Sequence, residues 1–160
     1  MTTTTNPDAI VNEIQIMAQP EQVFQALIEP SKVVQWWGQV GTYRCTKFQA
    51  DLRAGGKWSS SGIGPDGGPF EVYGEYLEVD APRLLVYTWI ASWTGDAKTV
   101  VRCELIAKEN GTLLRIRHSG LSAYPELAQK YQGWPRLLEW LRDYLETGAT
   151  VDTREKARLT

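Results

Sequence analysis

The sequence is poor in the residues that build metal centres and covalent cross-links. It contains 2 cysteines and 1 histidine in 160 residues. Cys45 and Cys103 lie far apart, outside any metal-ligand spacing, and each falls in an alternating, strand-like run, so we expect two reduced thiols in the core. His118 is the only histidine. The sequence therefore predicts no disulfide framework, no metal site, no cofactor and no catalytic constellation.

Charge and hydropathy exclude further classes of protein. Lys and Arg number 17 against 19 Asp and Glu, and this balance gives no electrostatic signature of nucleic-acid or anionic-lipid binding. No apolar run approaches the roughly 18 residues that a membrane-spanning helix needs. Residues 1–9 are rich in threonine and contain neither the basic segment nor the apolar segment of a secretory signal. We expect a cytoplasmic protein that neither binds nucleic acid nor inserts into membranes.

Alternation of apolar and polar residues predicts a series of strands. The first covers residues 10–18, where Ile10, Ile14, Ile16 and Ala18 fall on one side of a two-residue period. Further strands are predicted at 43–52, 57–63, 70–79, 84–93, 99–107 and 112–118. Most are joined by short turns rich in Gly, Pro, Asn and Asp, including the Asn110-Gly111 hairpin signal. Strands joined in this way are antiparallel neighbours.

Helical periodicity appears at two places. After the first strand, Pro20 opens a short helix that Pro30 ends, and Ser31 caps a second one over residues 32–37. The long C-terminal helix carries its apolar residues on one stripe, namely Trp134, Leu138, Leu141 and Leu145. Pro135 and Gly133 predict a kink or break at residues 131–134.

These elements predict one α+β domain over residues 10–147, between flexible tails at 1–9 and 148–160. A sheet of about six to seven antiparallel strands with one long helix must curl around that helix to bury its apolar face. Five segments carry a resemblance in this order: "PEQVFQALIEPSKVVQWWG" (20–38), "DLRAGGKW" (51–58), "VYGEYLEVDAPRLLVYTW" (72–89), "TLLRIRHSGL" (112–121) and "GWPRLLEWLRDYLE" (133–146). They resemble the Hsp90 ATPase activator homologue-like family of the START/Bet v 1-like (SRPBCC) superfamily, which implies the helix-grip fold.

The resemblance implies a cavity between the sheet and the long helix, and the aromatic residues suit its walls. The chain has 7 Trp and 7 Tyr but only 3 Phe, and Trp and Tyr combine an apolar body with a polar atom. The candidate pocket residues are Trp36, Trp37, Trp58, Tyr76, Trp89, His118, Tyr131, Trp134, Leu138 and Leu141. The same indoles would alternatively fill the interior, so the sequence leaves open whether the cavity is open or plugged.

The tryptophan pair, His118 and the loop at residues 64–69 could each line the cavity or have a purely structural role. Adjacent Trp36 and Trp37 on one helix would point about 100° apart, so we expect one in the core and the other at a cavity wall or in solvent. His118 is expected on the core side of its strand, either as a general base or as a structural histidine. The loop at residues 64–69 is a hairpin tip or a lip over the cavity mouth. Arg102, Arg115 and Arg117 are expected on the solvent face, paired with glutamates across strands.

Three functions remain open at this point. The first is a non-enzymatic binding domain for a small apolar or aromatic ligand, which would enter near Gly133 and the Trp36–Trp37 rim. The resemblance also implies a co-chaperone-like domain that acts on a heat-shock protein 90 ATPase, with a role in the stress response. The third is a cyclase- or hydratase-type enzyme that uses the same cavity with His118 or an inward carboxylate. A homodimer is compatible with each.

Overall fold

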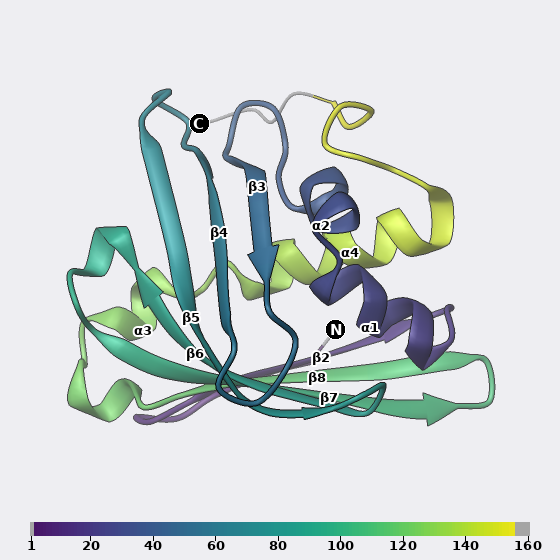
Figure 1. Ribbon diagram of the computed structural model, residues 1–160, viewed down its shortest axis with the longest axis horizontal. Helices are drawn as coiled ribbons and strands as arrows, with labels where there is room; N and C mark the ends of the chain where they lie inside the picture. The colour runs from purple at the N-terminus through teal and green to yellow at the C-terminus, as the bar shows by residue number, and fades with distance from the viewer. Residues whose placement is uncertain (1, 156–160) are drawn as a thin grey trace.

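The computed structural model describes residues 2–155 as one strongly curved antiparallel sheet with helices on its concave side (Figure 1). The elements in chain order are β1 (Thr2–Thr5), β2 (Ile10–Ile16), α1 (Pro20–Ile28), α2 (Pro30–Trp36), β3 (Arg44–Ala50), β4 (Lys57–Ile63), β5 (Pro69–Asp80), β6 (Leu84–Ala91), the 3-10 turn η1 (Ser92–Thr94), β7 (Lys98–Lys108), β8 (Gly111–Ser119), the 3-10 turn η2 (Leu121–Ala123), α3 (Leu127–Lys130) and α4 (Trp134–Thr147). The strands lie in the order β1-β2-β8-β7-β6-β5-β4-β3. The sheet curls around α4, which confirms the predicted α+β helix-grip fold.

The sheet has eight strands rather than six to seven, because the N-terminal segment contributes one. Residues 1–9 were predicted to be a flexible tail, but β1 pairs with β2 from Thr2 opposite Glu13 to Thr5 opposite Ile10. Thr3 Oγ1 also donates a hydrogen bond to the side-chain oxygen of Asn12 at 2.7 Å. Threonine is β-branched and suits an edge strand, although it leaves no apolar periodicity to detect.

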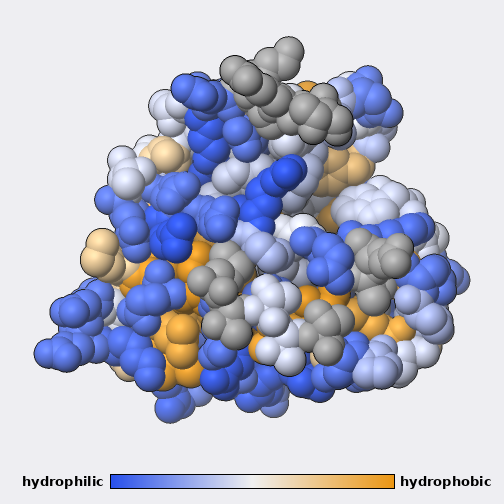
Figure 2. Space-filling model, turned by 180° about the vertical axis from the view of Figure 1, so that it is seen from behind, coloured by the Kyte–Doolittle hydropathy of each residue, from blue (hydrophilic) through white to orange (hydrophobic). Residues whose placement is uncertain are grey.

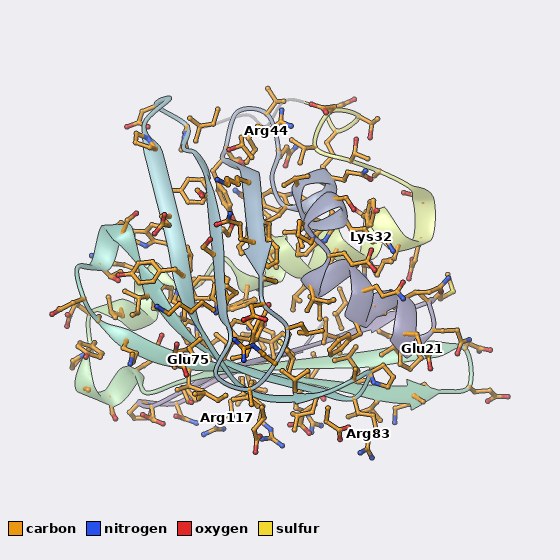
Figure 3. The ribbon with its side chains drawn as sticks, viewed as in Figure 1. Glu21, Lys32, Arg44, Glu75, Arg83 and Arg117 are labelled. Atoms are coloured by element: carbon orange, nitrogen blue, oxygen red, sulfur yellow. The ribbon has the colours of Figure 1, made fainter. Side chains whose placement is uncertain are left out.

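The outer surface is polar, as the alternation along the strands predicted. Seen from behind, hydrophilic side chains cover most of the surface and apolar residues lie in separate groups between them (Figure 2). Arg83 and Arg117 point away from the space that the sheet encloses (Figure 3). The interior is therefore left to apolar and aromatic side chains.

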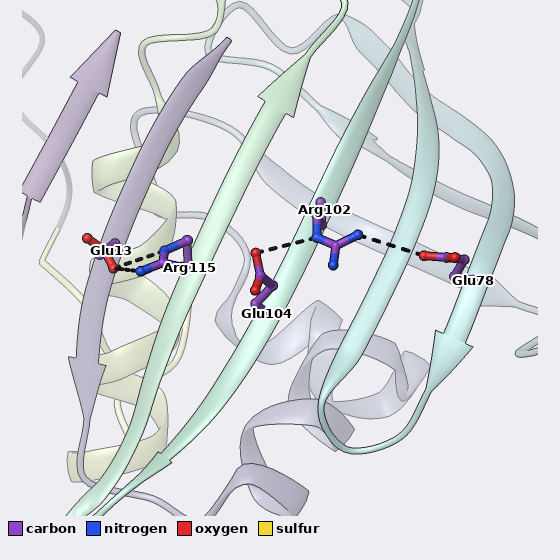
Figure 4. Close-up of polar contacts among 5 residues, drawn as sticks. All are labelled: Glu13, Glu78, Arg102, Glu104 and Arg115. Carbon is purple, nitrogen blue, oxygen red and sulfur yellow. Dashed lines mark hydrogen bonds and ion pairs between the residues drawn. The ribbon is translucent and has the colours of Figure 1, made fainter.

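Ion pairs cross the outer face of the sheet, which confirms the predicted partners of two arginines (Figure 4). Arg115 donates from Nε and Nη2 to Glu13 Oε2 at 3.0 and 2.9 Å, across the β2–β8 pair. Arg102 lies 3.4 Å from Glu104 and 3.8 Å from Glu78. Such half-exposed pairs contribute at most about 1 kcal/mol each, so they define the outer face more than they stabilise it.

The helices begin at prolines, in part differently from the prediction. Pro20 opens α1 as expected, and Pro30 opens α2 as well as ending α1. The residue at the N-cap of α2 is thus Glu29 and not Ser31, because proline is favoured at the first helical position. The predicted break is confirmed: α3 ends at Lys130, and α4 starts at Trp134 with Pro135 in its first turn. No helix within residues 2–155 is both long and apolar enough to cross a membrane.

Strands β4, β5 and β6 approach one another closely at Gly74. A Cβ atom on Gly74 would lie 1.9 Å from the carbonyl oxygen of Thr88, so only glycine fits there. Trp58 is the cross-strand partner of Gly74 and donates from Nε1 to the same Thr88 oxygen at 3.1 Å. Glu75 N–H bonds to Thr88 Oγ1 at 2.8 Å instead of a backbone carbonyl. The missing side chain therefore allows both this close approach and the position of the Trp58 indole.

A C-terminal clasp, residues 148–155, holds α2 against α4. Arg154 donates to the carbonyl oxygens of Trp36, Gly38 and Trp140 at 2.8–2.9 Å. Val151 is buried, and its N–H bonds to the Gln35 carbonyl at 2.7 Å. The prediction of a flexible tail at 148–160 is therefore wrong for residues 148–155, and residues 156–160 lie outside the described part. A single buried valine and one arginine leave no periodic signal in the sequence.

Candidate ligand-binding site

The space between the sheet and α4 is filled by side chains. An inner cavity of only about 30 Å³ remains there, which is the share of one molecule in liquid water. Its walls are aromatic and aliphatic side chains from α2, α4 and the sheet. They are Leu27, Trp36, Trp37, Phe48, Trp58, Tyr76, Leu85, Tyr87, Trp89, Cys103, Ile116, Trp134, Leu137 and Leu138. Of the two possibilities left open by the sequence, the plugged interior applies to the centre of the grip.

Trp89 is the central plug. It projects from β6, its side chain is 6% exposed, and its ring centroid lies 5.5–6.5 Å from those of five other aromatic residues. These are Trp37, Trp58, His118, Tyr131 and Trp134. The contacts are tilted, stacked or edge-to-face, which are the arrangements that aromatic rings favour. Trp89 thus ties β6 to α2, β4, β8 and the start of α4.

A larger space opens at the rim of the grip. This rim pocket has a volume of about 310 Å³ and is lined by Trp37, Tyr43, Gly64, Pro65, Phe70, Val72, Trp89, Trp93, Lys130, Tyr131, Gly133, Trp134 and Leu137. Its walls come from the end of α2, the β4–β5 loop, η1 and the turn between α3 and α4. The β4–β5 loop thus forms one lip of the pocket, which was one of its two predicted roles. Trp37, Trp89, Trp134 and Leu137 line both spaces and separate them.

The candidate residues from the sequence divide between these two spaces. Trp37, Trp89, Tyr131 and Trp134 line the rim pocket, and Trp36, Trp58, Tyr76 and Leu138 line only the inner cavity. His118 and Leu141 are fully buried and line neither space. Sequence reasoning missed Tyr43, Phe70 and Trp93 in the rim pocket. A signal existed for Phe70 alone, which follows the loop considered as a lip.

Trp36 and Trp37 stack on each other instead of pointing about 100° apart, but only Trp37 lines the rim pocket, which agrees with the expectation of one indole in the core and one at a cavity wall. Their rings stack with centroids 5.8 Å apart and an interplanar angle of 9°. Trp37 follows the last residue of α2 with φ −86° and ψ 90°, so the helical rotation of 100° no longer applies to it. Trp36 Nε1 donates to the carbonyl oxygen of Ala26 at 2.8 Å, while Trp37 Nε1 donates to the Tyr43 hydroxyl at 3.3 Å. The end of α2 thus places one indole on the pocket wall and the other behind it.

His118 anchors the turn between α3 and α4 from behind the pocket. Trp134 Nε1 donates to His118 Nδ1 at 3.1 Å, so Nδ1 is unprotonated, because an indole nitrogen can only donate. The proton of the neutral ring is then on Nε2, which lies 2.6 Å from Thr99 Oγ1. The Tyr131 ring stacks on the imidazole with centroids 4.5 Å apart. Burial lowers the pKa of His118 to about 3, so it stays neutral near pH 7.

This burial predicts a pH dependence of stability. Because the pKa of His118 is about 3 in the folded chain and 6.5 ordinarily, only the unfolded chain takes up this proton between those values. The free energy of unfolding should fall as the pH is lowered through this window, with a His118 contribution of about 1.4 kcal/mol per pH unit near pH 5. Urea titrations from pH 7 to 4 measure the slope. His118→Gln, which lacks the titrating group, should show a shallower slope, and equal slopes would contradict the assignment.

Two buried polar atoms in the pocket wall have no hydrogen-bond partner within residues 2–155. They are Trp89 Nε1 and the hydroxyl of Tyr131, which belong to side chains 6% and 4% exposed. An unsatisfied buried polar group costs about 1–3 kcal/mol. The only charged side chain in the lining is Lys130, which is exposed. No ion pair or hydrogen bond is found for its ammonium group among the residues that the structure describes.

The groups available for chemistry are few. No Asp, Glu or His is among the residues that line either space. Cys45 and Cys103 are buried free thiols, as predicted, and burial raises the pKa of Cys103 to about 12, which disfavours the reactive thiolate. Within residues 2–155, no group of three or more His, Cys, Asp or Glu could hold a metal ion. The two linings thus consist of aromatic, aliphatic and glycine residues, with Cys103 in the inner cavity and Lys130 in the rim pocket.

Comparison with known proteins agrees with this architecture. Residues 17–146 match the family described as "Activator of Hsp90 ATPase homolog 1-like protein". A search of curated proteins finds no match.

Solved structures are similar over most of the chain. A crystal structure of a protein from Chromobacterium violaceum is 26% identical, covers 88% of this chain and 99% of its own, and has a TM-score of 0.76. One from Rhodobacter sphaeroides is 21% identical, covers 92% and 96%, and has a TM-score of 0.77. The solution structure of an AHSA1-like protein from Aeromonas hydrophila is 21% identical, covers 95% and 99%, and has a TM-score of 0.72. These similarities support the same fold.

Proposed function

The chain belongs to the Activator of Hsp90 ATPase homolog 1-like family, and from this premise we propose that it is a non-enzymatic binding domain for a small apolar or aromatic molecule. The fold is shared with ligand-binding and co-chaperone-like domains, so the choice between them rests on the site. We place the ligand in the rim pocket. The sequence had suggested the space between the sheet and α4. The cavity that remains there has room for little more than one water molecule.

The observation that carries this proposal is the open, aromatic rim pocket beside a filled interior. Its volume of about 310 Å³ falls at the lower end of the 300–1,000 Å³ typical of small-molecule sites. Trp93 stands at its edge with 46% of its surface exposed and contacts Phe70 edge-to-face at 6.1 Å. An indole held half in water gains contact area when an apolar molecule enters, and no core packing depends on it.

Removing the Trp93 indole should weaken binding without unfolding the domain. A thermal-shift and native mass-spectrometry screen with naphthalene- and indole-based compounds identifies a ligand, and titration calorimetry then compares variants. Trp93→Ala is expected to lose about tenfold or more in affinity. Its free energy of unfolding should change by less than about 1 kcal/mol, because the side chain is half exposed.

Tyr73→Ala is the matched control for this experiment. Tyr73 is 40% exposed on β5 and does not line the pocket, so its removal should leave affinity unchanged. Equal losses in both variants would indicate a general surface effect and reject the rim pocket as the site. A screen that finds no bound compound would reject the proposed function.

The family also supports a second candidate, a co-chaperone-like role on a heat-shock protein 90 ATPase. The measurement is the ATPase rate of the chaperone with and without this chain, and an unchanged rate rejects it. The enzyme alternative required an inward carboxylate or histidine, and the lining of the two spaces provides neither. A homodimer and a cytoplasmic location remain proposals, and sedimentation of the purified chain tests the first.

A further inference from the structure

The charged side chain in the lining of the rim pocket lies at the α3–α4 turn, the segment from Lys130 to Trp134. Lys130, Tyr131, Gly133 and Trp134 of this segment line the pocket. The rest of the lining consists of Trp37, Tyr43, Gly64, Pro65, Phe70, Val72, Trp89, Trp93 and Leu137. None of these residues carries a charge, so the positive charge of Lys130 is confined to one side of the pocket.

From this asymmetry we infer that the ligand is an amphipathic organic anion, a small aromatic carboxylate whose carboxylate lies at the α3–α4 turn and whose ring lies against Phe70 and Trp93. The inference rests on the proposed function, because it names the class of ligand for the same pocket. Three independent features at or beside this turn point to a negative charge.

The first feature is the unpaired cation. Lys130 is the only charged residue in the lining, and no carboxylate accompanies it there. Among the described residues its ammonium group has neither an ion-pair nor a hydrogen-bond partner. A cation beside an apolar surface attracts an anion more strongly than in bulk water, because the pocket wall excludes solvent on one side.

The second feature is the N-terminus of α4. This helix has 14 residues and begins at Trp134, with Gly133 at its N-cap, and no side chain caps this end. Gly133 and Trp134 both line the pocket. The N-terminal end of a helix carries a partial positive charge and favours an anion at that position.

The third feature is the pair of unsatisfied donors. The rings of Tyr131 and Trp89 both line the pocket and meet edge to face with centroids 6.2 Å apart, and the Tyr131 hydroxyl and Trp89 Nε1–H are buried without a hydrogen-bond partner among residues 2–155. An anion with two oxygens accepts several hydrogen bonds at once. A neutral hydrocarbon would leave both donors unpaired, and an organic cation would meet Lys130 and the end of α4 unfavourably.

Three isosteric probes test the inference on the intact chain: 2-naphthoate, 2-naphthamide and 2-naphthylmethylammonium, compared by titration calorimetry in 50 mM salt. We expect the carboxylate to bind at least fivefold more tightly than the amide, and the ammonium to bind most weakly. Raising the salt to 500 mM should narrow the difference, because the Debye length shortens.

Matched variants locate the preference. Lys130→Gln and Tyr131→Phe should each reduce the carboxylate-to-amide affinity ratio at least twofold, because each variant weakens binding of the anion more than binding of the neutral amide. Lys108→Gln, at an exposed lysine beside the β7–β8 turn, should leave the ratio unchanged. Equal binding of the carboxylate and the amide, or a preference unaffected by Lys130→Gln and Tyr131→Phe, would overturn the inference and leave the proposed function intact. If none of the three probes binds the folded chain, both fail.

Discussion

Replacing Trp89 by alanine should lower the free energy of unfolding by about 3–5 kcal/mol. The indole is 6% exposed and contacts five aromatic rings, so its removal leaves a void that these rigid neighbours cannot fill. Such a loss is a large share of the 5–15 kcal/mol that stabilises a typical domain. Urea denaturation followed by circular dichroism measures it.

Two further variants show whether the effect belongs to this position. Trp93→Ala removes the same side chain from a half-exposed site and should cost less than about 1 kcal/mol. Trp89→Phe keeps a ring in place and should cost less than Trp89→Ala. A Trp89→Ala loss no larger than that of Trp93→Ala would contradict the role of Trp89 as the plug. Because Trp89 lines both spaces, its removal should also join the inner cavity to the rim pocket and admit longer ligands.

A methyl group at Gly74 should cost about 3 kcal/mol or more. The added Cβ would lie 1.9 Å from the Thr88 carbonyl oxygen, a backbone atom that cannot move without breaking its bond to the Trp58 indole. The clash therefore strains the pairing of β5 with β6 and also displaces the Trp58 side chain. Chemical denaturation of Gly74→Ala measures the loss, and failure to yield folded protein is the same result in its extreme form.

Gly133→Ala is the control for this substitution. Gly133 has φ −82° and ψ −6°, and a Cβ there meets no atom within 4 Å. Alanine fits this backbone and should stabilise the chain by about 0.4–1 kcal/mol through the unfolded state. If alanine changed the free energy of unfolding by a similar amount at both positions, close packing at Gly74 would not be the reason that glycine is required there.

The sequence was sufficient for the fold because its signals are local. Alternation along the strands, prolines at helix starts and the Asn110-Gly111 turn each act within a few residues, and all of them agree. The five family segments then identified the way the elements assemble. Local signals missed two segments. β1 consists of threonines without alternation, and the clasp depends on Val151 and Arg154, which bond to Gln35 and Trp36 in α2, more than 100 residues away in the chain.

The candidate site was predicted less completely, for a physical reason. Period and composition identified the aromatic residues but not the volume that they leave, which depends on ring orientations fixed by packing. Trp37 illustrates the limit, since its backbone leaves the helix at the last residue and turns the ring onto Trp36. Tyr43 and Trp93 were placed at the ends of predicted strands, but β3 begins at Arg44 and β6 ends at Ala91, so the two-residue period of a strand does not give the direction of either side chain.

The strand order has a consequence for how the chain is made. β2 pairs with β8, and Ile10 lies opposite His118, a separation of 118 − 10 = 108 residues. At about 5–20 residues per second, a ribosome needs about 5–20 s to synthesise that stretch. During this time Ile14 and Ile16 have no strand to pair with and no helix α4 to cover them. The nascent chain thus exposes an apolar strand for seconds, and its folding yield should depend on the factors that protect such strands during translation.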